Sequence, residues 1–140
     1  MDQLNLSEVT VGEVMTKVPR SIEPHQAIEI ARRWMDDMKV RHLPVRSGGK
    51  VVGILSDRDI NLLSGSASAL ESKAVVEDAM ISSVHTVSAN MKLKDVAQEM
   101  LEYRIGCVLI TEKGGGLMGI FTDTDALAIL AGKKQGEDDR

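Results

Sequence analysis

The stretch GILSDRD at residues 53–59 recurs as GIFTDTD at residues 119–125, which lies 66 positions later. Both stretches read Gly, Ile, an apolar residue, a hydroxyl residue, Asp, any residue and Asp. Upstream the match continues at an offset of 65 positions, where VGEVM at 11–15 aligns with VEDAM at 76–80. Identities are few, but the apolar pattern repeats over most of the chain. Such a period indicates two copies of one structural unit.

Each copy predicts the same elements in the same order, β-α-β-β-α. A short extended piece comes first. Apolar residues at i, i+3 and i+4 spacing then predict helices over 25–39 and 90–104, with Pro24 and Asn90 as residues that start helices. Two β-rich segments joined by a Gly-rich turn predict a hairpin in each copy. The segments are RHLPV, SGGK and VVGIL in the first copy and GCVLI, KGGG and LMGIF in the second.

The last helix of each copy is predicted over 57–64 and 123–131. Each is followed by a glycine, Gly65 or Gly132, at the place where helices often take a left-handed cap. Because glycine adopts positive φ without steric cost, both residues are expected to end their helices.

The chain is predicted to contain a first copy at 9–64, a linker at 65–74, a second copy at 75–131 and a flexible tail at 132–140. A copy of about 50 residues buries too little apolar surface to fold alone. We therefore expect a mixed α/β (α+β) fold in which the two copies pack around a pseudo-twofold axis. Such packing creates two related clefts where the copies meet.

Composition argues against several classes of protein. The net charge of -4 argues against a general nucleic-acid binder, which needs a basic face. One cysteine allows no internal disulfide, and three scattered histidines predict no metal site. No apolar run approaches the ~20 residues of a membrane span, and the N-terminus does not read as a secretory signal. We therefore expect a cytoplasmic protein with no nucleic-acid or membrane partner.

The repeated phrase has two compatible interpretations. Its hydroxyl residue and second Asp have the spacing of a capping box, which satisfies backbone groups at a helix start. The same groups suit a ligand, because a helix N-terminus attracts phosphate and a carboxylate accepts hydrogen bonds from the vicinal hydroxyls of a ribose. The glycine that opens the phrase permits a close backbone approach or a bulge. The paired residues are Ser56 and Asp59 in the first copy and Thr122 and Asp125 in the second.

The two copies resemble CBS domains, the repeat named after cystathionine beta-synthase. The first copy contains VGEVMT, SIEP, AIEIARRWM, VRHLPV and GGKVVGILSDRDI, and the second contains VEDAM, TVSA, LKDVAQEM, RIGCVLI and GGLMGIFTDTDAL. The resemblance covers about residues 9–131 and implies a tandem CBS pair, or Bateman module. It implies a regulatory, non-enzymatic, energy-sensing module that binds an adenine nucleotide (AMP, ADP, ATP, NAD or S-adenosylmethionine) between the repeats. It also implies a homodimer and no catalytic cofactor.

In the family, the hydroxyl residue and Asp of the phrase contact phosphate and ribose, and the base lies against the first strand of the other repeat. Basic residues before the LPV strand reach the phosphates. The resemblance therefore implies a main cleft formed by Val18, Pro19, Arg20, Arg41, His42, Pro44, Thr122 and Asp125.

A second cleft is implied with Ser56, Asp59, Ser83, Val84 and His85, the last as cleft wall or as surface residue, and with Arg58 as a source of positive charge. In the second copy, Gly106 and Cys107 stand at the positions of Arg41 and His42. Two cations are therefore missing from the second cleft. Because charge-assisted hydrogen bonds are the stronger ones, the cleft of Asp125 is expected to be the main site.

Four residues outside the phrase require separate interpretations. Trp34 aligns with Glu99, so the shared core does not require an aromatic side chain there; Trp34 and Met38 are expected at a dimer interface or at the flank of the core. Cys107 is expected to be a core residue rather than a nucleophile. His25 is expected on the surface at a helix start.

The sequence thus predicts a sensor of an adenine nucleotide that acts on an effector protein it does not reveal. One alternative is a structural dimerisation or docking module with degenerate clefts and no nucleotide ligand. The other is an enzyme that uses acid–base or metal-binding carboxylates, namely Asp57, Asp59, Asp123 and Asp125. No nucleophile motif or supporting ligand cluster accompanies these carboxylates in the sequence.

Overall fold

The computed structural model describes residues 7–17, 20–66 and 73–133. Backbone contacts divide the chain into two compact units. The α2 unit comprises Pro19–Val84, and the α6 unit comprises Met1–Val18 together with His85–Arg140. Neither unit is a continuous copy of the repeat, because the start of each copy belongs to the unit that contains the body of the other copy.

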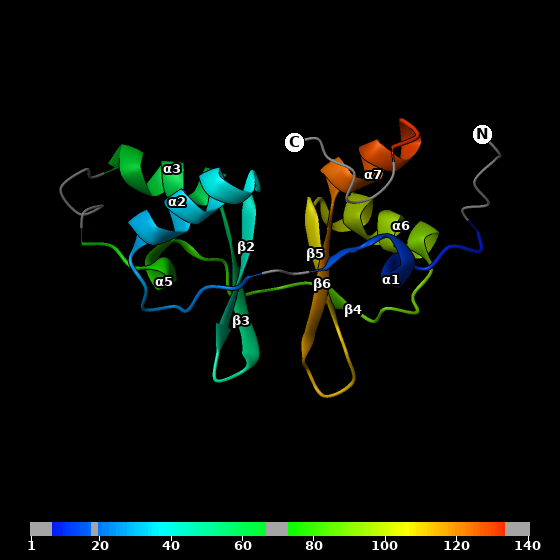
Figure 1. Cartoon of the computed structure of the whole chain (residues 1–140), viewed down its shortest axis with the longest axis horizontal. Helices are drawn as coiled ribbons and strands as arrows, with labels where there is room; N and C mark the ends of the chain where they lie inside the picture. The colour runs from blue at the N-terminus through cyan, green and yellow to red at the C-terminus, as the bar shows by residue number, and fades with distance from the viewer. Residues whose placement is uncertain (1–6, 18–19, 67–72, 134–140) are drawn as a thin grey trace. The chain divides into compact units, whose positions relative to one another are not determined.

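The α2 unit contains an antiparallel hairpin and its helices (Figure 1). The turn of the hairpin contains Gly48 and Gly49, with φ of 61° and 84°. The first predicted hairpin is therefore confirmed. The elements of the unit are α2 (Ile28–Met38), β2 (His42–Ser47), β3 (Lys50–Ser56), α3 (Asp57–Ser66) and α5 (Val76–Ala79).

The α6 unit is built on a four-stranded sheet with the order β1-β6-β5-β4. β4 runs parallel to β5, and the other pairs are antiparallel. The β5–β6 pair confirms the second predicted hairpin. The elements are α1 (Val11–Val14), β1 (Thr16–Lys17), β4 (Thr86–Val87), α6 (Leu93–Tyr103), β5 (Cys107–Thr111), β6 (Leu117–Thr122) and α7 (Asp123–Leu130).

The two long helices bury equivalent faces. Each face packs into the core of its own unit, and every buried side chain in the described part of the chain is apolar. The apolar spacing that predicted these helices is therefore confirmed as their core face. The buried residues are Ile28, Ala31 and Met35 on α2, and Leu93, Val96 and Met100 on α6.

The start of each copy docks on the loop before the long helix of the other copy. In the α6 unit, the N–H groups of Val11 and Gly12 donate to the carbonyls of Met91 and Ala89, over 2.9 Å in each case. These are two of the N–H groups that a helix start leaves without an intrahelical partner. The loop before α6 therefore completes the start of α1.

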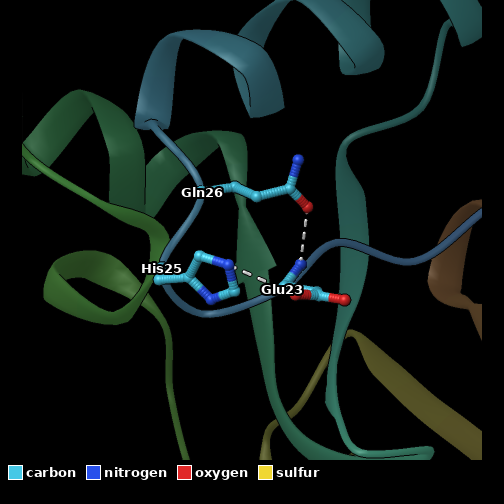
Figure 2. A network of polar contacts seen from close by, with 3 residues as sticks. All are labelled: Glu23, His25 and Gln26. Carbon is cyan, nitrogen blue, oxygen red and sulfur yellow. Dashed lines mark hydrogen bonds and ion pairs between the residues drawn. The ribbon is translucent and has the colours of Figure 1, made fainter.

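The loop before α2 completes the start of α5 in the same way. The N–H group of Val76 donates to the carbonyl of Gln26 over 2.8 Å. Figure 2 shows how this loop is folded: the side-chain oxygen of Gln26 accepts from the N–H group of Glu23 over 3.0 Å, and His25 Nε2 lies 3.3 Å from Glu23 Oε1. His25 is exposed at this position, as predicted.

The long helices begin later than predicted. Pro24 and Asn90 lie in turns, and the helices start at Ile28 and Leu93 instead of at 25 and 90. The N–H groups of Ile28 and Leu93 donate over 3.1 and 2.8 Å to carbonyls of the segments that lead into α5 and α1. The predicted first turns are therefore loops because they bind another segment of the chain.

Left-handed residues end three helices. Gly132 follows α7 with φ of 82°, which confirms it as a cap. The prediction for Gly65 was wrong, because α3 continues to Ser66; glycine tolerates helical backbone as well as positive φ, so its presence does not fix a helix end. α2 and α6 end instead at Lys39 and Arg104, with φ of 56° and 57°.

Replacement of Lys39 or Arg104 by glycine is expected to stabilise the protein. A side chain at positive φ costs about 1–2 kcal/mol, and the greater entropy of unfolded glycine offsets part of the gain, so each variant should gain about 0.5–1 kcal/mol. Urea titration would measure the free energy of unfolding. Lys39→Ala and Arg104→Ala serve as controls, which keep the steric cost and should show no gain. An equal effect of alanine and glycine would contradict the argument.

The glycine that opens each repeated phrase lies beneath a crossing segment. A Cβ on Gly119 would be 2.5 Å from Met15 Sδ and 2.8 Å from the carbonyl oxygen of Thr16. A Cβ on Gly53 would be 2.8 Å from Met80 Sδ and 3.0 Å from a backbone oxygen. The close-approach interpretation is therefore confirmed. The bulge interpretation holds too, because the strand register shifts directly after the Val45–Gly53 pair and directly after the Ile110–Gly119 pair.

Gly119→Ala is expected to destabilise the protein by about 1–3 kcal/mol, the usual cost of forcing atoms into a packed site. Gly53→Ala should cost less, because its Cβ would lie farther from the crossing segment. The free energies of unfolding of both variants, measured in urea, would test this order. Two neutral variants would show that the crossing segments move away freely.

Candidate functional site

The residues of the repeated phrase form a capping box at the start of α7. Thr122 Oγ1 accepts from the N–H group of Asp125 over 3.1 Å, and Asp125 Oδ2 accepts from the N–H group of Thr122 over 2.9 Å. Both residues are partly buried. The structural interpretation of the phrase is therefore confirmed, and it holds a hydroxyl and a carboxylate together at the end of β6.

The equivalent pair at the start of α3 uses its hydroxyl differently. Ser56 Oγ accepts from the N–H group of Asp59 over 3.1 Å and donates to Asp59 Oδ2 over 2.8 Å. Here the Asp59 carboxylate accepts a hydrogen bond from the Ser56 hydroxyl. At the start of α7, the Asp125 carboxylate accepts from the backbone N–H group of Thr122. The two pairs, which we call the Ser56 pair and the Thr122 pair, therefore share the hydrogen bond from the Asp N–H group to the hydroxyl and differ in what their carboxylates accept.

The α2 unit places an arginine and a histidine beside the Ser56 pair. The carbonyl of Arg41 accepts from the N–H group of Asp57 over 3.0 Å, and His42 faces Ser56 across the hairpin. Pro44 lies two residues farther along β2. Arg41, His42 and Pro44 therefore share a unit with Ser56, and their predicted role with Asp125 stays a prediction.

The α6 unit places no cation at the equivalent positions. The carbonyl of Gly106 accepts from the N–H group of Asp123 over 3.0 Å, and Cys107 faces Thr122 across the β5–β6 hairpin. Gly106 thus makes the same backbone hydrogen bond as Arg41, and Cys107 has the same place in its hairpin as His42, as the repeat alignment predicts. A Cβ on Gly106 would lie 3.0 Å from Asp123 Oδ2, so glycine makes space for this carboxylate.

Burial and two carboxylates keep the thiol of Cys107 protonated. Desolvation by burial, followed by the charges of Asp125 and Asp123, raises the pKa of Cys107 to about 12. Since the thiolate is the reactive form, this environment suppresses nucleophilic chemistry. The raised pKa agrees with the prediction that Cys107 is not a nucleophile, whereas the prediction of a core residue holds only in part, because Cys107 is half-buried.

Cys107 is expected to react with iodoacetamide at pH 8 at least about tenfold more slowly in the folded protein than in urea, because little thiolate forms. The neutral thiol also links stability to pH. Its contribution is fully present below the unfolded pKa and is lost as pH rises through the folded pKa of about 12. Because the folded pKa is so high, the rate of the iodoacetamide reaction with the folded protein should still increase with pH above 9. A reaction rate that is already constant there would contradict the raised pKa.

Two further predicted site residues contact the long helices. The guanidinium carbon of Arg20 lies 4.5 Å from the centre of the Trp34 ring. His85 Nε2 lies 2.6 Å from Glu99 Oε1, so this histidine is a partly buried residue with a defined partner. Trp34 packs against the core of the α2 unit. Its interpretation as a flank of the core is therefore confirmed, and its role in a dimer stays a prediction.

The other predicted residues are less closely tied to the phrase. Met38 packs beside the core of the α2 unit, Arg58 is exposed in the first turn of α3, and Ser83 is exposed outside any helix or strand. Val84 is partly buried. Val18 and Pro19 lie outside the described residues, as do most of the residues predicted to form the linker and the tail.

Sequence reasoning missed the segments that cross the phrase. Ile81 pairs with Ile54 through two backbone hydrogen bonds of 2.9 Å, and Thr16 pairs with Ile120 in the sheet. The aligned segments EVMT (13–16) and DAMI (78–81) could have indicated the crossing, since a Met directly precedes Thr16 in one and Ile81 in the other. These segments lie next to the strands whose ends hold the Ser56 and Thr122 pairs.

The described residues lack the features of two other types of site. They contain no group of three or more His, Cys, Asp or Glu side chains that could hold a metal ion. No helix in the described ranges is long and apolar enough to cross a bilayer.

A family model of the CBS domain matches residues 11–63 and 76–132, one match for each copy of the repeat. The chain belongs to the CBS domain family. The resemblance of the two copies to a tandem CBS pair and the mixed α/β fold are thereby confirmed. The family model begins each match at the leading helix, although the compact units exchange these helices.

Solved CBS structures and a curated relative cover most of the chain. CBSX2 in complex with AMP is 28% identical, with a TM-score of 0.75, over 89% of this chain and 97% of that one. The CBS pair of MJ0100, in complex with 5-methylthioadenosine and S-adenosyl-L-methionine, is 26% identical, with a TM-score of 0.76, over 90% and 98%. The CBS domain-containing protein YhcV of Bacillus subtilis is 30% identical over 111 residues, 79% of this chain and 78% of YhcV.

Other relatives are much longer proteins. Homoserine O-acetyltransferase of Methanococcus vannielii is 27% identical over 84% of this chain, which spans 24% of its length. Inosine-5'-monophosphate dehydrogenase of Thermoplasma acidophilum is 28% identical over 76% of this chain, which spans 21% of its length. The CBS pair of this chain thus matches about a quarter or less of these enzymes.

Proposed function

We propose that this CBS pair is a regulatory, non-catalytic module that binds an adenine nucleotide and acts on an effector protein. Membership of the CBS family supports a ligand-binding role. Two structural relatives of similar size bind AMP, or 5-methylthioadenosine and S-adenosyl-L-methionine. All of these ligands contain adenosine or a thio derivative of it. A compound with an adenine and a ribose is therefore the ligand class that the relatives support.

The observation that carries this proposal is the twofold occurrence of a hydroxyl and a carboxylate at a strand end. Capping alone would be satisfied by many residue combinations. A carboxylate has about four acceptor positions, more than the capping interaction alone uses, so a carboxylate at this place in the phrase suits the vicinal hydroxyls of a ribose as well as the helix start. The same two side chains can thus cap the helix and bind a ligand.

We assign the ribose role to Asp125 and Asp59 and the hydroxyl contacts to Thr122 and Ser56. Phosphate binding is assigned to cationic residues, since a guanidinium donates charge-assisted hydrogen bonds to phosphate. The residues for phosphate and base contacts are those of the family resemblance: Val18, Pro19, Arg20, Arg41, His42, Pro44, Arg58, Ser83, Val84 and His85.

Titration calorimetry with AMP, ADP, ATP, NAD and S-adenosylmethionine would test the function. Asp125→Ala is expected to weaken nucleotide binding by about tenfold or more, because it removes a charged acceptor. Asp59→Ala is the matched variant, since it removes the equivalent carboxylate from the Ser56 pair. It should leave the tighter binding event intact. Thermal unfolding of both variants shows whether each remains folded.

Loss of binding in Asp59→Ala alone would reverse the assignment of the main site. A folded protein that binds none of the five compounds would contradict nucleotide sensing. That result would favour a dimerisation or docking module, which would be consistent with the exposed apolar side chains on α7. Leu127 and Leu130 on α7 are 65% and 74% exposed, although both are large apolar residues.

A further inference from the structure

Arg20 lies over the single tryptophan of the chain. Its guanidinium carbon is 4.5 Å from the centre of the Trp34 ring, and both residues belong to the α2 unit. A cation at this distance from an indole ring is attracted by the negative ring face. Trp34 is anchored by the core of the unit, whereas Arg20 is exposed. The ring therefore fixes the position of an exposed charge.

The contact leaves the hydrogen-bond donors of Arg20 available. A guanidinium carries five N–H donors, and an aromatic ring attracts its charge without consuming them. Within the described ranges, the guanidinium of Arg20 makes no hydrogen bond or ion pair. Arg20 is thus held in place without being neutralised.

The equivalent pair in the other copy is used differently. The residues 65 positions later are His85 and Glu99, whose Nε2 and Oε1 atoms lie 2.6 Å apart. The ring of His85 also lies 5.2 Å from the ring of Tyr103. In the second copy, the Glu99 carboxylate pairs with the ring nitrogen of His85. In the first copy, Trp34 contacts Arg20 through its ring and takes none of the N–H donors of Arg20. Of the two equivalent positions, Arg20 is therefore the one equipped for an anion.

We propose that Trp34 is a positioning residue that holds Arg20 for a phosphate group of the ligand. This inference rests on the proposed function, because it takes the ligand to be a nucleotide. Guanidinium–phosphate pairs are frequently bidentate and require a defined orientation. A side chain that is already ordered loses less entropy when it binds. The ring thus raises affinity for the phosphate without touching the ligand.

Calorimetry of the intact protein with adenosine and AMP, which differ by one phosphate, tests this role. Arg20→Gln is expected to lower the affinity for AMP about tenfold or more. Trp34→Leu should lower it about two- to fivefold, and Trp34→Phe, which keeps an aromatic face, should recover most of that loss. None of the three variants should change the affinity for adenosine.

The double variant shows whether Trp34 acts through Arg20. If it does, Trp34→Leu adds nothing in the Arg20→Gln background, because neighbours that act on one contact are not additive. Full additivity, or an equal loss of AMP and adenosine binding in Trp34→Leu, would overturn the inference. Either result would mean that Trp34 supports the fold in general rather than the phosphate contact.

The fluorescence of Trp34 separates this inference from the proposed function. Pyrophosphate, a probe without a base, is expected to change the emission of the unmodified protein but not that of Arg20→Gln. If no nucleotide binds and this response is present, the anion site stands and nucleotide sensing is wrong. If AMP binds and Trp34→Leu leaves its affinity unchanged, nucleotide sensing stands and the positioning role is wrong. A protein that responds to neither pyrophosphate nor nucleotide overturns both.

Discussion

The fold depends on two places where the start of one copy crosses a glycine in the body of the other. At Gly119, a Cβ would lie 2.8 Å from the carbonyl oxygen of Thr16, so any larger residue would force the crossing segment away. The pairing of β1 with β6 depends on that proximity. The same phrase that ends in the Thr122 pair therefore begins with the glycine that admits the other copy, and one short stretch serves both fold and site.

The repeated elements could be predicted from the sequence because their signals are local. Apolar spacing predicted the buried faces of α2 and α6, and Gly-rich turns predicted both hairpins. The helix starts could not be predicted in this way. The N–H group of Ile28 finds its acceptor 46 residues away, at Ala74, and no local propensity at Pro24 contains that information. The exchange of leading segments between the units was missed for the same reason.

The candidate site shows the same division between local and distant information. The capping interactions follow from a spacing of three residues and were predicted, although only the Thr122 pair forms the full reciprocal box. The contact between Arg20 and Trp34 joins an extended segment to a helix, and it depends on side-chain directions that periodicity does not specify. The raised pKa of Cys107 depends on a strand register that brings it opposite Thr122 and near two carboxylates.

Comparison of the copies separates what the fold requires from what it leaves open. The carbonyls of Arg41 and Gly106 each accept a hydrogen bond of 3.0 Å from the first N–H group of the following helix. A backbone carbonyl does this whatever its side chain, so the fold does not require an arginine at position 41. Position 20 is open for a different reason: histidine stands at its equivalent, position 85, and contacts Glu99, whereas Arg20 contacts Trp34. The fold therefore leaves the residue type open at both positions, and under the proposed function a phosphate group would account for an arginine at each.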